Sequence, residues 1–342
     1  MGGVYTFVGL VDEWLEEESI EKYEDRLKEG QVIINNLCAY IRSPFTLASR
    51  YDELSKDNPI SEGIYKDNQQ KFYSDKAELK AEADVRLGII QEIHDRIQGP
   101  DKNTPGAWSD FEYDFSGSTF FYPIDLTNSY YAKPINFSGS TYKGWANFSG
   151  STYQSRADFT GSTYQGGAYF SGSTYKGGAD FSGSTYQGGA KFTDSTYENE
   201  TDFSGSIFYQ ETYFGEDIYS NSSSCFTNHA PQFYDKKNRK NTLFGSHNND
   251  FTVDIDKGYP INLNSEGLPL GCKFFTSEQK EYLADKLQEI DETNNKLLEA
   301  KDDEEKARLS DMLRPLYKEL RKWREEATTV KVEDVAAEDT ES

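Results

Sequence analysis

Aromatic residues recur at a fixed interval through the middle of the chain. One series of Phe or Leu and a second series of Tyr or Phe each step by 11 residues, and the second follows the first by five. Because Gly, Ser and Thr fill the positions between them, an amphipathic helix cannot produce this spacing. A short fixed period of this kind predicts a solenoid. The ten copies contain Phe115, Leu126, Phe137, Phe148, Phe159, Phe170, Phe181, Phe192, Phe203 and Phe214, and Phe120, Tyr131, Tyr142, Tyr153, Tyr164, Tyr175, Tyr186, Tyr197, Phe208 and Tyr219.

Small residues accompany each aromatic residue at fixed offsets. Ala stands two residues before the repeating Phe, as at Ala168, and Ser stands two before the repeating Tyr, as at Ser162. A small and a large residue two positions apart point to the same face of an extended segment. Gly follows the Phe by two residues, as at Gly172, and can adopt the positive φ of a tight corner. The pattern therefore predicts short extended sides with aromatic residues inward and glycine at the corners.

The repeated unit resembles that of the pentapeptide-repeat family, in which a large apolar residue stands between small and polar ones. "ADFSG" at 179–183 and "STYQG" at 184–188 each fit it, and one extra residue separates successive pairs. The resemblance covers residues 111–220. It implies a right-handed quadrilateral β-solenoid with four sides and 22 residues per coil, hence about five coils and a rod of about 25 Å. Tyr is an unusual central residue, and each hydroxyl is expected to find a partner or to lean toward the surface.

The flanking segments carry helical patterns. Residues 1–106 are predicted to form a helical N-terminal region, in which Ile20, Tyr23 and Leu27 keep helical spacing. His94 lies on the apolar face of a longer helical stretch and is predicted to be a core or boundary residue. Residues 221–275 read as an irregular, loop-rich segment with a short strand or two.

A helical hairpin is predicted after that segment, over residues 276–327. Thr276 and Gln279 form a capping-box signature at its start, and Pro315 is expected to divide or kink its second helix. Residues 328–342 are acidic and are predicted to be a disordered tail.

Composition narrows the classes of partner and compartment. The chain has 36 basic and 59 acidic residues and a net charge of −23, which argues against direct binding to nucleic acid. Its three cysteines are widely separated, so a disulfide framework is not expected and a reducing, cytoplasmic location is favoured. Gly2 and Thr6 match an N-myristoylation pattern, but no polybasic second signal follows, so stable membrane attachment is not expected. The alternative for this terminus is a glycine-rich, frayed end.

No residue pattern singles out a catalytic, cofactor-binding or metal site. Cys225, His229, His247 and Cys272 could supply four zinc ligands, but the 24 residues between the last two are a loose spacing for a structural site. Buried thiols and polar loop histidines are the preferred interpretation. The aspartates of "DFTVDID" at 250–256 lack the register of a calcium loop and predict a turn. Neither a phosphate-binding loop nor a nucleophile elbow is found, so the chain is predicted not to be an enzyme.

The leading functional hypothesis is a non-catalytic protein–protein interaction or assembly scaffold. In it, the rigid solenoid spaces two helical ends, whose apolar faces and aromatic residues Trp14 and Trp323 bind a protein partner or a second copy of the chain.

Two alternatives stay open. One, implied by the family resemblance, is a DNA mimic that interacts with a topoisomerase; residues 131–190 carry four basic and only two acidic residues, which disfavours it. The other is binding of ice or polysaccharide through the threonine column from Thr141 to Thr196, whose alternate members are expected on opposite faces of the coil.

Overall fold

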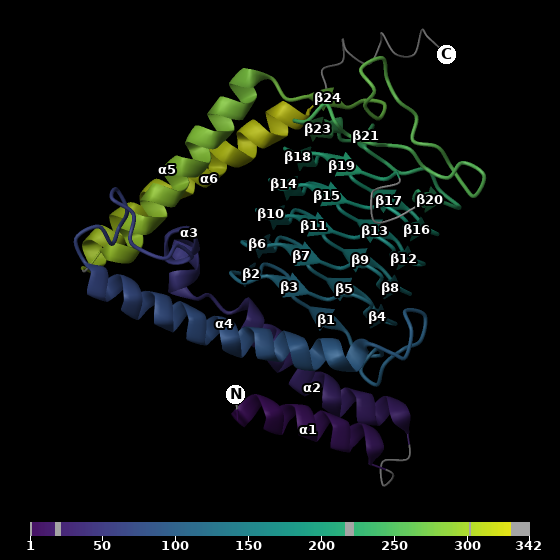
Figure 1. Ribbon diagram of the computed structural model, residues 1–342, viewed down its shortest axis with the longest axis horizontal. Coiled ribbons are helices and arrows are strands. Elements are labelled where there is room, and N and C mark those ends of the chain that lie inside the picture. Colours follow the sequence, from purple (N-terminus) through teal and green to yellow (C-terminus); the bar gives the residue numbers. More distant parts are fainter. Residues whose placement is uncertain (1, 18–21, 216–221, 301, 330–342) are drawn as a thin grey trace.

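The computed structural model describes residues 2–17, 22–215, 222–300 and 302–329 (Figure 1). A helical N-terminal region lies across one end of a β-solenoid, and a hairpin of two long helices runs from the other end back toward it. No helix among these residues is both long enough and apolar enough to cross a membrane. The predicted fold class, a β-solenoid flanked by helices, is confirmed.

Four parallel sheets form the sides of the solenoid, which makes about five turns between residues 113 and 213. From β1 to β19, strands on successive coils pair at an interval of 22 residues, as in Thr163↔Thr185 and Ala168↔Ala190. This interval is the coil length that the resemblance implies. The two-residue strands leave the backbone free to turn at every corner.

Each side of the solenoid is a sheet of two-residue strands. The first sheet contains β1 (Tyr113–Asp114), β5 (Ile135–Asn136), β9 (Ala157–Asp158), β13 (Ala179–Asp180) and β17 (Thr201–Asp202). The second contains β2 (Thr119–Phe120), β6 (Thr141–Tyr142), β10 (Thr163–Tyr164), β14 (Thr185–Tyr186), β18 (Ile207–Phe208), β23 (Leu243–Phe244) and β24 (Lys273–Phe274). The third contains β3 (Ile124–Asp125), β7 (Ala146–Asn147), β11 (Ala168–Tyr169), β15 (Ala190–Lys191) and β19 (Thr212–Tyr213). The fourth contains β4 (Tyr130–Tyr131), β8 (Thr152–Tyr153), β12 (Thr174–Tyr175), β16 (Thr196–Tyr197) and β20 (Cys225–Phe226).

The repeating aromatic residues fill the interior as stacked columns. Ring centroids lie 5.1 Å apart in Phe159–Phe181 and 4.8 Å apart in Tyr164–Tyr186, with nearly parallel rings. Every described member of the two series is buried, and Tyr219 lies outside the described residues. At the corners, the glycines that follow the Phe have positive φ, 67° at Gly172. The predicted inward aromatic residues and glycine corners are therefore confirmed.

Buried serines join successive coils. The Ser184 hydroxyl accepts a hydrogen bond from the backbone N–H of Ser162 (3.1 Å) and donates one to the Phe159 carbonyl (2.9 Å). Equivalent bonds recur along the rod, for example at Ser173 and Ser195. The small residue before each Tyr is thus a polar link between coils as well as a space-saving one.

The tyrosine hydroxyls do not meet the expectation from the sequence. Their rings are at most 2% exposed, and the hydroxyls have no hydrogen-bond partner among the described residues. Burial raises the pKa of Tyr164 well above its ordinary value, and the Ser162 hydroxyl opposes that shift only in part. The phenols are held by ring stacking, which leaves their oxygens without compensation. The seven residues are Tyr131, Tyr142, Tyr153, Tyr164, Tyr175, Tyr186 and Tyr197.

The N-terminal region caps the first coil. It contains α1 (Gly2–Glu16), α2 (Tyr23–Arg42), the 3₁₀ helix η1 (Thr46–Arg50), α3 (Tyr51–Leu54) and α4 (Gln69–Ile97). Gly30 of α2 lies so close to Phe111 that a Cβ would stand 2.6 Å from its ring. His94 is buried, with Nε2 2.7 Å from the Thr127 carbonyl oxygen, as a core or boundary residue should be. Gly2 begins a helix, so the frayed-end interpretation is wrong, and Ile20 lies outside the described residues.

Parallel pairing continues beyond residue 220, into the segment predicted to be loop-rich. β20 extends the fourth sheet, and β23 and β24 extend the second. These added strands cannot be recognised from the 11-residue period because insertions interrupt it. Leu243, for example, pairs with Ile207, 36 residues earlier in the chain. A small antiparallel hairpin, β21 (Tyr234–Asp235) with β22 (Lys240–Asn241), projects from this part.

Two helices, α5 (Ser277–Glu299) and α6 (Asp303–Thr328), lie side by side and complete the described chain (Figure 1). The capping box is present: Gln279 N–H donates to Thr276 Oγ1 (3.2 Å), and Thr276 N–H donates to Gln279 Oε1 (3.0 Å). Pro315 lies inside α6 and does not divide it, so of the two expected outcomes, division or a kink, the first is wrong. Residues 330–342 of the predicted acidic tail lie outside the described residues.

Candidate binding groove

The helical hairpin is anchored on the last coils of the solenoid. Ile207 and Leu243, which point outward from the second sheet, form an apolar cluster with Phe275 and Leu283. Trp323 packs against this cluster and stacks on Tyr282, with ring centroids 5.4 Å apart. Trp323, one of the two tryptophans expected to bind a partner, is therefore partly buried within the chain itself. Trp14, on α1, likewise packs against the main core.

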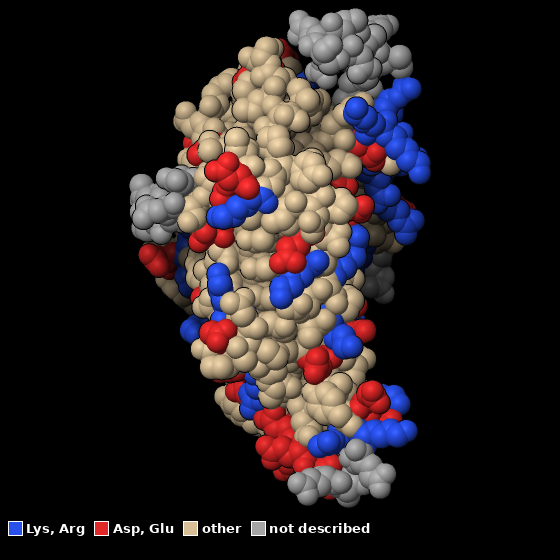
Figure 2. All heavy atoms as spheres, turned by 90° about the vertical axis from the view of Figure 1, so that its right-hand side faces the viewer, with Lys and Arg blue, Asp and Glu red and all other residues tan. Residues whose placement is uncertain are grey.

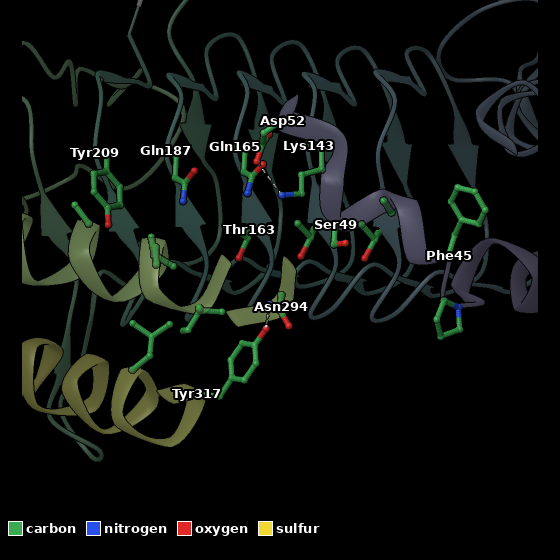
Figure 3. A pocket seen from close by; sticks show the side chains of 18 residues that line it. Phe45, Ser49, Asp52, Lys143, Thr163, Gln165, Gln187, Tyr209, Asn294 and Tyr317 are labelled. Carbon is green, nitrogen blue, oxygen red and sulfur yellow. Dashed lines mark hydrogen bonds and ion pairs between the residues drawn. The ribbon is translucent and has the colours of Figure 1, made fainter. Parts of the chain in front are cut away.

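At its other end the hairpin reaches the N-terminal region, where α5 contacts η1. The hairpin thus crosses the outer face of the second sheet like a strap, and Figures 1 and 3 show both ends of this arrangement. A groove of about 880 Å³ lies between the strap and the sheet. It is lined by Pro44, Phe45, Ala48, Ser49, Asp52, Thr119, Thr141, Lys143, Thr163, Gln165, Gln187, Tyr209, Ala284, Leu287, Ile290, Asn294, Tyr317 and Leu320.

The wall of the groove on the solenoid side is polar and periodic. Thr119, Thr141 and Thr163 occupy equivalent positions on successive strands of the second sheet. Gln165 and Gln187 stand at the corner that follows these strands, one coil apart. Hydroxyl and amide groups are thus repeated at the coil spacing, about 4.8 Å.

The opposite wall is mainly apolar. Ala284, Leu287 and Ile290 of α5 face the groove together with Leu320 of α6. Near the far end, the Asn294 side-chain amide donates to the Tyr317 hydroxyl (3.1 Å; Figure 3). A molecule in the groove would therefore meet a hydrogen-bonding surface on one side and a hydrophobic surface on the other.

Charged and titratable groups lie at two points along the groove. Lys143 Nζ is 3.5 Å from Asp52 Oδ2, and the Lys143 side chain is only 9% exposed (Figure 3). Tyr209 has no hydrogen-bond partner for its hydroxyl among the described residues. Burial raises the pKa of Tyr209 to about 12, against the opposing effect of the Arg324 charge. Although Tyr209 lines the groove, its hydroxyl oxygen is itself buried.

Comparison with known proteins bears on the solenoid wall. Residues 154–196 match the family model described as "Pentapeptide repeats (9 copies)". This part of the solenoid is built of pentapeptide repeats. No curated protein and no solved structure matches the chain.

The residues weighed as metal ligands from the sequence are not brought together in the structure. Cys225 and Cys272 are buried, whereas His229 and His247 are exposed, and His247 packs on the Phe274 ring. Within the described ranges, no group of three or more His, Cys, Asp or Glu side chains is placed to hold a metal ion. The stretch 250–256 ends in a turn, in which Asp254 pairs with Lys257 (2.7 Å).

The threonine column divides between two faces of the pentapeptide-repeat solenoid, as predicted. Thr141, Thr163 and Thr185 lie on the second sheet, and Thr152, Thr174 and Thr196 on the fourth. The strap crosses only the second sheet, so the two faces differ although their sequences are nearly the same. Sequence reasoning missed the groove because no periodic signal joins residues 44–52 to residues 284–320. The one signal that could have found it was Ile207, an outward Ile where the eight preceding copies have Thr or Tyr.

Proposed function

We propose that this repeat protein is non-catalytic and binds an extended segment of a partner protein in the groove between the second sheet and the α5–α6 strap. The contrast between the two walls of the groove carries the proposal. Side chains of an extended peptide alternate in direction, so one set would meet the threonines and glutamines while the other meets the leucines. The volume lies within the range of about 300–1,000 Å³ that is usual for ligand sites.

This proposal modifies the hypothesis that the helical ends bind while the solenoid only spaces them. Leu283, Ile290 and Leu313 of the hairpin are buried, so much of its apolar surface is already used. The strap contributes its remaining apolar residues to a site that the second sheet completes. The solenoid is therefore part of the proposed binding surface as well as a spacer.

DNA mimicry receives less support. Asp158, Asp180 and Asp202 stand one above another on the first sheet. Each carboxylate accepts a backbone N–H two residues on, from Thr160, Ser182 and Ser204 respectively, so it serves a corner turn. Arg156 also pairs with Asp180 (2.6 Å). The face in Figure 2 is mostly uncharged, with acidic and basic side chains interspersed, whereas a mimic needs a continuous line of negative charge.

Binding of ice or polysaccharide across the threonine columns is also less well supported. The strap covers the second-sheet column, and on the fourth sheet Thr152 is buried and donates to the Lys102 carbonyl (2.7 Å). Neither face offers a broad, flat array of free hydroxyls.

Two matched variants test the proposed groove. Thr163→Trp fills the groove, whereas Thr174→Trp places the same residue at the equivalent strand position on the fourth sheet. Binding partners are to be captured from the native host with the full chain and with each variant. We expect Thr163→Trp to lose the partner and Thr174→Trp to keep it. Equal capture by both variants, with both folded by circular dichroism, would place the site elsewhere.

A further inference from the structure

A concentrated basic surface lies beside the end of α6, in a chain of net charge −23. Lys236, Lys237 and Arg239 are three of the four residues that join β21 to β22, Lys240 is the first residue of β22, and all four cations are exposed. Because α6 contacts β22, Arg321 and Arg324 lie on the same side of the molecule. None of the four cations in residues 236–240, nor Arg321, forms an ion pair within the described ranges. Figure 2 shows basic side chains gathered along the upper right edge of one face.

Arg324 is the inner residue of this surface. A cavity of about 400 Å³ is lined by three cations, three carboxylates and several neutral groups; the charged residues are Lys240, Arg321, Arg324, Asp202, Asp235 and Glu325. The Arg324 guanidinium donates to the Gly183 carbonyl, and no carboxylate of the described residues pairs with it. Burial lowers the pKa of Arg324 to about 10. A partly buried guanidinium without an anionic partner is stabilised when an anion enters.

The chain itself supplies anionic groups at this place. Thr328 lines the cavity, and Thr329 forms an antiparallel bridge with Lys240, so the backbone leaves α6 directly along the edge of β22. Residues 330–342 follow, with five acidic residues and one lysine. Thirteen residues can span about 40 Å when extended, more than enough to cover the loop.

We propose that the basic surface formed by residues 236–240, Arg321 and Arg324 is a docking site for acidic peptide segments, occupied by the chain's own residues 330–342. Covalent attachment gives this segment a high effective concentration, so weak charge pairs suffice to hold it. The site is independent of the strap groove.

Distance measurement between two spin labels tests this in the full chain. Cys38, Cys225 and Cys272 are buried, so Gln232→Cys, beside the cavity, and Ser342→Cys, at the end of the tail, supply the accessible thiols. We expect a population of short distances between the two labels. This population should be lost near 1 M salt, where charges more than about 3 Å apart hardly attract each other. The same population should be lost in Lys236→Glu/Lys237→Glu and when the five tail acids are changed to amides.

The matched control is Lys133→Glu/Lys176→Glu, which changes two exposed lysines of the solenoid by the same charge and should keep the short distances. If the loop variant and the control give the same distribution, the proposal is wrong. Addition of excess unlabelled protein separates a further alternative. Short distances between two labels on one chain persist when labelled protein is diluted with unlabelled protein. Their loss would mean that the tail docks on a second copy of the chain, which also overturns the proposal.

Discussion

At the scale of single residues, the tyrosines of the solenoid are the least expected feature. Seven buried phenols keep their oxygens without hydrogen-bond partners among the described residues, whereas a phenylalanine would stack equally well. A buried, unsatisfied hydroxyl costs about 1–3 kcal/mol. Ring stacking and the exclusion of water from the interior therefore have to outweigh a repeated penalty. The neighbouring Phe columns fill their positions without that cost.

Removal of one hydroxyl should stabilise the protein. We expect Tyr164→Phe to raise the free energy of unfolding by up to about 1–3 kcal/mol, because it removes an uncompensated polar atom and leaves the stacked ring in place. The reverse change in the adjacent column, Phe170→Tyr, should lower it. Urea denaturation of both variants measures the two effects. A clear loss of stability in Tyr164→Phe would mean that the hydroxyl has a partner, such as a bound water.

At the scale of elements, the columns of tyrosines make stability depend on alkaline pH. Burial raises the pKa of every tyrosine in the two columns. Above about pH 10 the unfolded chain loses phenolic protons that the folded chain keeps. The folded state then binds more protons, so the free energy of unfolding falls as pH rises.

We predict that stability is constant with respect to these groups below about pH 10 and falls steeply above it. Each buried tyrosine contributes about 1.4 kcal/mol per pH unit until its own folded pKa is reached. Denaturant melts between pH 8 and pH 11, together with tyrosinate absorbance, measure the slope. In the double variant Tyr164→Phe/Tyr186→Phe, the free energy of unfolding should fall less steeply with pH, by the contribution of two tyrosines. If the folded double variant forms less tyrosinate than the folded wild type does, the stacked tyrosines ionise before the chain unfolds, which would contradict the prediction.

The elements also show what a sequence of this kind can and cannot predict. The position of Phe170 or Gly172 in a coil depends only on residues nearby, so an 11-residue period suffices to place it. The rungs at β20 and β23 follow insertions and lose the period, although they use the same sheets. Pro315 lies within an unbroken helix, a position that local preference alone disfavours. The groove depends on contacts between the two ends of the chain, which no repeat records.

At the scale of the whole molecule, the strap makes the two halves of each coil unequal. Eleven residues carry the chain halfway around the solenoid, and 22 carry it once around. The interior would accept the removal of either 11 or 22 residues, since the Phe and Tyr series both step by 11. The hairpin would accept only the removal of 22 residues, because it must leave the last coil on the face where η1 lies.

Two deletions separate these requirements. Removal of residues 166–187, one full coil, should keep the hairpin on the second-sheet face, with α5 extending about 4.8 Å past its present contact with η1. Removal of residues 166–176 should keep the aromatic core but turn everything downstream to the opposite face. We expect the shorter deletion to give the larger radius of gyration in X-ray scattering and to lose protection from hydrogen exchange at residues 46–50. Similar scattering from both proteins would argue that the hairpin is not fixed by the solenoid.

The strap also bears on how such a chain can change its number of repeats. Open solenoids gain and lose copies freely, since each coil contacts only its neighbours. In this protein a helix with a rise of about 1.5 Å per residue spans coils stacked about 4.8 Å apart. Each added coil would thus demand about three more residues in both α5 and α6. A duplication in the solenoid would therefore have to be accompanied by an insertion in each helix of the hairpin. Because both changes are needed at once, the number of coils is expected to stay constant during evolution.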